Sequence, residues 1–281
     1  MHPALEHQLS RVSNAIRRLP GAVELYLYGS ASDPSLADAY SDLDLQVVCE
    51  NFSFSQTAWP AILTRAGEIE LAFPIEATPL SASFTIVYAS ESPYHKVDIG
   101  LSDQAQENSF IQQVKSKKLF WRQPAYHGQS DLSPRALSQG INYIPAADGA
   151  AHFMLGEMLS SIRYLKARKR GQHLTCWRFL SAKLNARLRC YQWNGDPQVF
   201  PEGQLSTWNT VALDRQLAEA DRLDLLTALN LTSPVEMDRS LFLLTGQIVQ
   251  GIQPRLTPED APAAILARHT MDFIGSELGF A

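Results

Sequence analysis

The sequence predicts an α+β fold, with a mixed β-sheet and flanking helices in the N-terminal part and an α-helical bundle in the C-terminal part. Strand-like and helix-like patterns alternate up to about residue 119, whereas strand signals nearly vanish from Ala147 onward and long helical stretches follow. Residues 128–145, between the two parts, are rich in Ser, Pro, Gly and Asn. We therefore expect a first domain at residues 1–127, a linker at 128–146 and a second domain at 147–281.

The N-terminal part opens with an amphipathic helix over residues 5–19, which Pro20-Gly21 ends. The β-branched and aromatic run at residues 23–28 predicts a buried strand. Residues 43–49 predict a second strand, in which apolar side chains face one way and Asp44 and Gln46 face the other. The further predicted elements of this part are a helix over residues 56–66 and strands over residues 83–89 and 95–101.

The C-terminal part carries helix-compatible periodicity in one stretch after another. The predicted helices cover residues 154–168, 175–193, 208–229, 234–249 and 258–278. Prolines separate several of them, among them Pro201, Pro234, Pro254 and Pro258. This pattern predicts an α-helical bundle.

Composition narrows the classes of function. Charged residues make up 19% of the chain and the net charge is −5, which is typical of a soluble globular protein. Long nucleic acids are usually bound by clustered Lys and Arg, so we expect no nucleic-acid partner, and an acidic surface suits a cationic small molecule better. The N-terminus lacks a signal-peptide core and no apolar run approaches a membrane span, so we expect a cytoplasmic protein without membrane contact.

Metal and cofactor motifs of several common kinds are absent from the sequence. The three cysteines, Cys49, Cys176 and Cys190, are too few and too scattered for a disulfide framework or a zinc site. There is no P-loop, no Gly-x-Gly-x-x-Gly element and no Gly-x-Ser-x-Gly element. These absences argue against P-loop, Rossmann and serine hydrolase functions.

The segment from residue 25 to residue 46 carries the strongest chemical signal. A buried strand ends in Gly29-Ser30, and eleven residues separate Ser30 from Asp42. Asp42 and Asp44 are two residues apart, so on a strand both carboxylates project from the same face and repel each other unless a cation such as Mg²⁺ lies between them. Gly29 lets the backbone approach a phosphate, Ser30 offers a hydroxyl and an N–H, and a helix beginning within residues 31–36 would add a favourable N-terminus.

Each fragment alone has a simpler explanation. A Gly-Ser pair after a strand is usually only a turn, and an Asp-x-Asp pair is usually a solvated strand edge or a helix cap. Their combination is more specific, because the apolar side chains of Leu43 and Leu45 force both carboxylates away from the core. We therefore interpret the segment as a nucleotide and metal site.

This pattern resembles the signature of the DNA polymerase β-like nucleotidyltransferase superfamily. The run Tyr40-Ser41-Asp42-Leu43-Asp44, followed by a hydrophobic strand, is most similar to bacterial aminoglycoside and lincosamide nucleotidyltransferases. The resemblance covers residues 25–48 and implies a third carboxylate on a later strand. Asp98 fits that position, because it alternates with Val97, Ile99 and Leu101, whereas its competitors lie outside such a pattern: Glu76, Glu91 and Asp103.

The resemblance implies that residues 1–127 form a nucleotidyltransferase domain and residues 147–281 a helical substrate-binding domain. It implies transfer of a nucleoside monophosphate, AMP from ATP, to a hydroxyl of a small molecule such as an antibiotic, with release of pyrophosphate. Gly29 and Ser30 would bind the phosphates, while Asp42, Asp44 and Asp98 would hold Mg²⁺. The general base stays open between Asp98 and Glu157.

A basic run near residue 166 allows a second phosphate contact. Its members are Arg163, Lys166, Arg168, Lys169 and Arg170. We select Lys166 as the nucleotide-binding residue of this run, against the simpler explanation of a solvated basic end that the helix dipole favours.

Two other functions remain open at this point. One is a regulatory nucleotidyltransferase that modifies a protein partner, as antitoxin-like members of the superfamily do. The other is a nucleotide-binding module without catalysis, against which the complete set of three aspartates argues. The acceptor, the preferred nucleotide and the oligomeric state, with a homodimer among the options, are not specified by the sequence.

Overall fold

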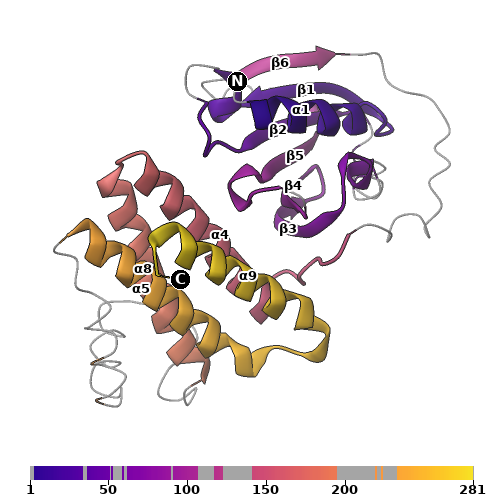
Figure 1. Ribbon diagram of the computed structural model, residues 1–281. Coiled ribbons are helices and arrows are strands. Elements are labelled where there is room, and N and C mark those ends of the chain that lie inside the picture. Colours follow the sequence, from indigo (N-terminus) through magenta and orange to yellow (C-terminus); the bar gives the residue numbers. More distant parts are fainter. Residues whose placement is uncertain are drawn as a thin grey trace. The chain divides into compact units, whose positions relative to one another are not determined.

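The chain consists of two compact units, Met1–Ala147 and Asp148–Ala281. The computed structural model describes residues 3–33, 37–50, 52, 59, 62–89, 91–106, 117–122, 141–194, 219, 223 and 233–280. The first unit holds a β-sheet with helices and the second is helical (Figure 1). The predicted α+β fold is therefore confirmed, and the predicted linker at residues 128–146 lies mostly outside the described residues.

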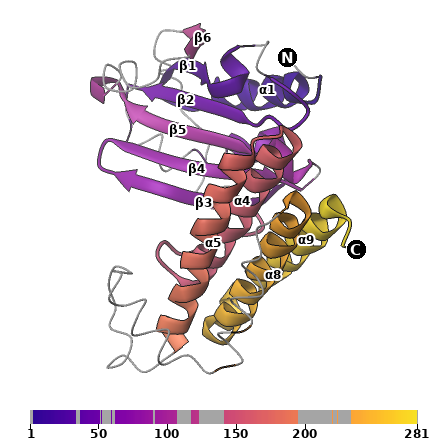
Figure 2. The same ribbon diagram turned by 90° about the vertical axis from the view of Figure 1, so that its left-hand side faces the viewer.

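The first unit is built on a six-stranded mixed sheet with the order β3-β4-β5-β2-β1-β6 (Figure 2). The strands are β1 (Ala22–Tyr28), β2 (Leu43–Cys49), β3 (Ile69–Thr78), β4 (Ser81–Tyr88), β5 (Val97–Asp103) and β6 (Lys117–Arg122). Strands β2 and β5 run parallel, whereas the other paired strands run antiparallel. The parallel pair lies in the middle of the sheet, so the ends of β2 and β5 are fixed from both sides.

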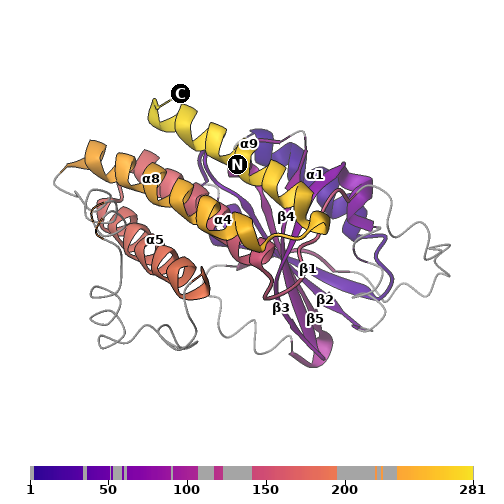
Figure 3. The same cartoon turned by 90° about the horizontal axis from the view of Figure 1, so that it is seen from below.

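Helix α1 (Pro3–Ile16) covers one face of this sheet (Figure 3). Its Leu9 and Val12 join one buried cluster with Leu43, Leu45 and Val47 of β2. Because side chains alternate along a strand, burial of these three residues turns Asp44 and Gln46 toward the opposite face. The hydrophobic pattern of β2 thus decides which face of the sheet carries its polar groups.

Both edge strands, β3 and β6, lie outside the strands that the sequence predicted. Strand β3 contains Pro74, which cannot donate a backbone hydrogen bond and is tolerated because β3 lies at an edge. The register between β3 and β4 shifts at Pro74 and Glu76, which breaks the alternation that a pattern search needs. Strand β6 begins with Lys117 and Lys118, and such charges are common on edge strands.

The segment before β3 contains the remaining helical structure of this unit. Of the helix expected over residues 56–66, the described residues Trp59, Ile62 and Leu63 are helical and Thr64–Ala66 forms a 3₁₀ turn, while the rest lies outside the described residues. Residues 141–143 add a short pairing to the free edge of β3, through Asn142 N–H to the Ile69 carbonyl at 2.8 Å and Ala72 N–H to the Tyr143 carbonyl at 3.0 Å.

The second unit is formed by helices that pack against one another around α4 (Figure 2). Its long helices are α4 (Ala150–Lys169), α5 (His173–Asn194), α8 (Pro234–Ile252) and α9 (Ala261–Leu278). Helix α4 contacts α5, α8 and α9, and its buried side chains include Met154, Ile162 and Leu165. The helix predicted over residues 208–229 falls outside the described residues, except for Glu219 and Leu223, which are helical.

The last helix begins later than predicted. Residues Pro258–Asp260 form a 3₁₀ turn, in which the Thr257 N–H and hydroxyl both donate to the Asp260 carboxylate at 2.9 Å. Helix α9 then starts at Ala261, with Pro262 in its first turn, where its missing N–H costs nothing. Among the described helices of the chain, none is long and apolar enough to cross a membrane.

Candidate active site

A row of side chains crosses the centre of the sheet on the face opposite α1. Asp44 of β2 is the register partner of Tyr28 on β1 and of Asp98 on β5, and Asp98 is in turn the partner of Thr85 on β4. Paired residues on neighbouring strands lie about 5 Å apart and point to the same face. We call Tyr28, Asp44, Asp98 and Thr85 the transverse row. Two carboxylates directly opposite each other repel, so the row requires a nearby positive charge.

Lys96 provides positive charge at this position. Its ammonium group binds Asp42 Oδ2 at 2.8 Å and also contacts Asp98 Oδ2, and only 1% of its side chain is exposed. Burial by itself lowers the pKa of Lys96, but the charges of Asp98 and Asp42 and the hydrogen bonds to them outweigh burial, so this pKa is raised. Lys96 therefore stays a cation at neutral pH and joins two of the three aspartates.

The two ends of the transverse row are the hydroxyl groups of Thr85 and Tyr28, which are hydrogen-bond donors. The Thr85 hydroxyl donates a hydrogen bond to Asp98 Oδ1 at 2.5 Å. Asp98 therefore accepts a hydrogen bond from Thr85 on one oxygen and from the Lys96 ammonium on the other. At the opposite end, burial and then the charges of Asp44, Asp98 and Asp42 raise the pKa of Tyr28. The Tyr28 hydroxyl therefore stays protonated beside the carboxylates.

Asp42 lies just before β2 and is positioned by the turn that precedes it. The Asp38 carboxylate accepts hydrogen bonds from the Ser41 hydroxyl and the Tyr40 N–H, both at 3.0 Å. The turn is tied to the segment before β5, because His95 Nε2 lies 2.9 Å from the Ala39 carbonyl. Strand β2 begins at Leu43, as the sequence predicted, so Asp42 precedes the strand and is held by these loop contacts.

Gly29 and Ser30 follow β1 and lie beside the row, in the 3₁₀ turn Gly29–Ser32. Gly29 has a φ of +59°, and a Cβ atom at this position would collide with Asp44 Oδ2. Glycine is therefore required both by the backbone conformation and by the close approach of the Asp44 carboxylate. The turn ends at Ser32 and Asp33 is extended, while residues 34–36, where a helix could begin, lie outside the described residues.

We expect Gly29→Ala to destabilise the first unit and displace the Asp44 carboxylate. The left-handed φ alone costs an alanine about 1–2 kcal/mol of folding free energy, and the collision adds to it. Gly171→Ala is the matched control, since Gly171 has a φ of +69° and a Cβ atom there would meet no described atom within 4 Å. Urea denaturation should give a larger loss for Gly29→Ala. Equal losses would show that Asp44 moves aside freely.

The structure brings Asp98 opposite Asp44 and places its three competitors elsewhere. Glu76 is exposed on the edge strand β3. Glu91 forms an ion pair with Arg11 at 2.5 Å. Asp103 ends β5 and accepts a hydrogen bond from Ala105 N–H at 2.9 Å. Of the acidic residues considered for a third carboxylate, Asp98 is the one that lies opposite Asp44, and its role as a metal ligand stays a prediction.

The donor chemistry of the three aspartates fits a hard divalent cation, since carboxylate oxygens are the ligands that Mg²⁺ prefers. Asp42 and Asp98 already hold a cation in this structure, the ammonium of Lys96. Within the described ranges, no three His, Cys, Asp or Glu side chains are gathered as they would be around a metal ion. A divalent cation bound by Asp42 and Asp98 would therefore have to compete with the Lys96 ammonium.

Lys166 and Glu157, the predicted contributors from the helical part, both lie on α4. Lys166 is nearly buried, at 5% exposure, and its nucleotide-binding role stays a prediction. The Glu157 carboxylate forms an ion pair with Lys183 at 2.7 Å, and the Lys183 ammonium also contacts the Glu157 carbonyl. Glu157 thus has a structural partner that the sequence did not indicate.

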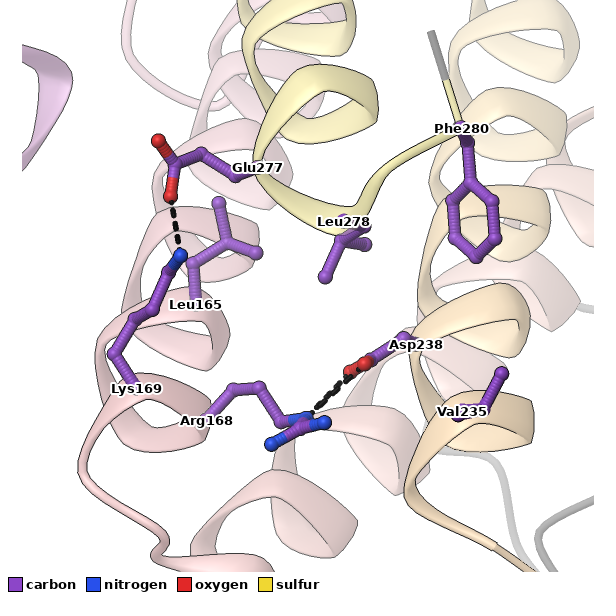
Figure 4. A pocket seen from close by; sticks show the side chains of 8 residues that line it. All are labelled: Leu165, Arg168, Lys169, Val235, Asp238, Glu277, Leu278 and Phe280. Carbon is purple, nitrogen blue, oxygen red and sulfur yellow. Dashed lines mark hydrogen bonds and ion pairs between the residues drawn. The ribbon is translucent and has the colours of Figure 1, made fainter.

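The basic run at the end of α4 borders a pocket of about 440 Å³ in the helical unit (Figure 4). Arg168 Nε lies 3.0 Å from Asp238 Oδ2, and Lys169 Nζ lies 2.9 Å from Glu277 Oε2. The Tyr164 hydroxyl also donates to Asp238, at 2.9 Å. Both cations are thus paired with carboxylates, which weakens the explanation of this run as a triphosphate site.

No family model and no curated protein sequence matches this chain. Among solved structures, it is similar to an aminoglycoside 6-adenyltransferase from Bacillus subtilis, with a TM-score of 0.33 and 16% identity over 96% of this chain and 98% of that chain. It is also similar to a STING-associated CdnE c-di-GMP synthase from Capnocytophaga granulosa, with a TM-score of 0.24 and 14% identity over 99% and 80% of the chains.

Proposed function

We propose that this chain is a Mg²⁺-dependent nucleotidyltransferase that transfers a nucleoside monophosphate, AMP from ATP, to a hydroxyl of a small molecule and releases pyrophosphate. The observation that carries the proposal is the register pairing of Asp44 with Asp98, beside Asp42 and next to Gly29. Three carboxylates on neighbouring strand ends, together with a turn that only glycine can form, suit a phosphate and divalent-cation site. The Gly29-Ser30 and Asp42-Leu43-Asp44 pattern supports the same class.

In this proposal Gly29 and Ser30 bind the triphosphate through backbone N–H groups and the Ser30 hydroxyl. Asp42, Asp44 and Asp98 would hold Mg²⁺, which would neutralise phosphate charge and lower the pKa of the acceptor hydroxyl. Asp98 accepts the hydroxyl proton, and Thr85 orients it through the 2.5 Å hydrogen bond. Positioning and charge neutralisation account for most of the rate enhancement of such reactions.

We further propose that the helical part, residues 147–281, binds the acceptor. The pocket beside α4 offers an apolar lining, including Leu165, Leu278 and Phe280, and two carboxylates, Asp238 and Glu277. Asp238 and Glu277 are already paired with Arg168 and Lys169, so the support for a cationic ligand comes from the net charge of −5 of the chain. A cationic antibiotic such as an aminoglycoside belongs to this class.

The proposal is tested by incubating the full chain with α-³²P-labelled ATP, Mg²⁺ and a panel of acceptors: aminoglycosides, lincosamides and a small-molecule cell extract. We expect label to appear on at least one small-molecule acceptor, in equal amount to the pyrophosphate released. A parallel reaction with a protein extract tests the antitoxin-like alternative, in which the label appears on a protein. Nucleotide binding without any transfer would leave only a binding module and contradict the proposed activity.

A further inference from the structure

Lys96 is the buried charge at the centre of the site, and the proposed function does not use it. Its backbone is extended, with φ −64° and ψ 161°, so its side chain leaves the chain on the same side as Asp98, two residues later. Its carbonyl accepts a hydrogen bond from Leu43 N–H at 3.2 Å, which fixes it beside the start of β2. The ammonium therefore reaches Asp42 and Asp98 from a rigid position.

This ammonium occupies carboxylate oxygens that a divalent cation would need. A divalent ion held by Asp42 and Asp98 would use their carboxylate oxygens as ligands. Lys96 Nζ already contacts Oδ2 of both residues. Two cations cannot bind the same pair of oxygens at full strength, because each lowers the attraction for the other.

We infer that Lys96 is a built-in counter-ion, which neutralises Asp42 and Asp98 in the metal-free protein and competes with the divalent cation for them. This inference rests on the proposed function for the metal, but it concerns a residue of the chain itself. It explains how the carboxylates of Asp42 and Asp98 lie near a shared point without a metal. It also means that metal binding is coupled to withdrawal of the ammonium from at least one carboxylate.

The test is direct Mn²⁺ binding to the full, nucleotide-free chain, with free Mn²⁺ counted by electron paramagnetic resonance. Lys96→Met removes the competing charge, and we expect it to tighten Mn²⁺ binding by at least about tenfold, or about 1.4 kcal/mol. Lys96→Arg keeps the charge and should bind Mn²⁺ about as the unchanged chain does. Lys118→Met, at an exposed position on β6, controls for the loss of one positive charge elsewhere in the unit.

Thermal melting provides the second measurement. Without metal, Lys96→Met should melt at a lower temperature than the unchanged chain, because Asp42 and Asp98 lose their counter-ion. Mn²⁺ should raise the melting temperature of Lys96→Met by more than it raises that of the unchanged chain. Unchanged or weaker Mn²⁺ binding by a folded Lys96→Met would overturn the inference. A Lys96→Met chain that stays unfolded with saturating Mn²⁺ would also count against it, because the metal then does not replace the ammonium.

The Asp44→Asn variant separates this inference from the proposed function. If the unchanged chain binds Mn²⁺ and Asp44→Asn does not, the metal site exists, and the Lys96 variants alone decide the inference. If neither chain binds Mn²⁺ but Lys96→Met does, competition by Lys96 is supported. If no variant binds Mn²⁺, the metal-dependent function and the inference both fail.

Discussion

Asp44→Asn is expected to remove most nucleotide transfer while leaving the protein folded. The amide has nearly the same shape as the carboxylate, but one anionic ligand is lost, and we expect the rate to fall by about 100-fold or more, or about 2.7 kcal/mol of activation free energy. Removal of one of two facing charges also relieves repulsion with Asp98, so the melting temperature should stay equal or rise. The measurements are pyrophosphate release and thermal melting.

Two further substitutions make this prediction specific. Asp42→Asn should also remove most transfer, but it weakens the 2.8 Å ion pair with Lys96 and should lower the melting temperature. Asp103→Asn is the control, since it lies on the same strand as Asp98 and its amide oxygen can still accept from Ala105 N–H. Full transfer by a folded Asp44→Asn or Asp42→Asn would disprove the metal site and the proposed function with it.

Glu157→Gln is expected to lower the free energy of unfolding of the helical unit by about 3 kcal/mol, because it leaves a buried ammonium without its counter-charge. The Lys183 side chain is fully buried and its ion pair with Glu157 measures 2.7 Å. Burial lowers the pKa of Lys183 by more than Glu157 raises it, which shows how strongly this ammonium depends on its partner. Urea denaturation followed by circular dichroism measures the loss.

The double variant Glu157→Gln with Lys183→Met provides the matched control. It removes the buried charge together with its partner, so it should regain most of the lost stability. The same pair of variants decides whether Glu157 is the general base. If Glu157→Gln keeps full stability and loses transfer, Glu157 acts in the chemistry, and the structural role that its contact with Lys183 indicates is wrong.

The aspartates of the site could be found from the sequence because their signals are local. The alternation of apolar residues in 43–49 predicts the face of the strand on which the Asp44 side chain lies. The alternation around residue 98 does the same for Asp98. That the two are direct partners could not be found, because the register between β2 and β5 depends on pairing between distant strands. The local sequence pattern also does not show that β2 and β5 run parallel.

Lys96, Thr85 and Tyr28 were missed for different physical reasons. Lys96 carried a usable signal, since it lies two residues before Asp98 and so shares its side of the chain. Thr85 gave no such signal, because its role arises from the register of β4 with β5. Tyr28 looked like one more aromatic residue of a buried strand, and its position beside Asp44 follows only from the β1–β2 pairing.

In the helical part, long segments with amphipathic periodicity were predicted as helices, whereas the positions of the helix ends were predicted less accurately. Helices α4, α5 and α8 extend a few residues beyond their predicted limits, as end effects usually do. The start of α9 was misjudged because two prolines, Pro258 and Pro262, each fit a first turn, and only the capping contacts of Thr257 distinguish them. Ion pairs such as Glu157 with Lys183 depend on how the helices pack, which helical spacing does not specify.

The parallel pairing of β2 with β5 has a consequence for the order in which the site can form during synthesis. Strands β3 and β4 lie between them in the chain, so a growing polypeptide presents Asp42 and Asp44 well before it contains Lys96 or Asp98. Until β5 has emerged and inserted between β2 and β4, the early aspartates lack both their counter-ion and their third partner. On the proposed function, a nascent N-terminal segment therefore lacks a complete metal and nucleotide site until β5 pairs with β2 in the sheet.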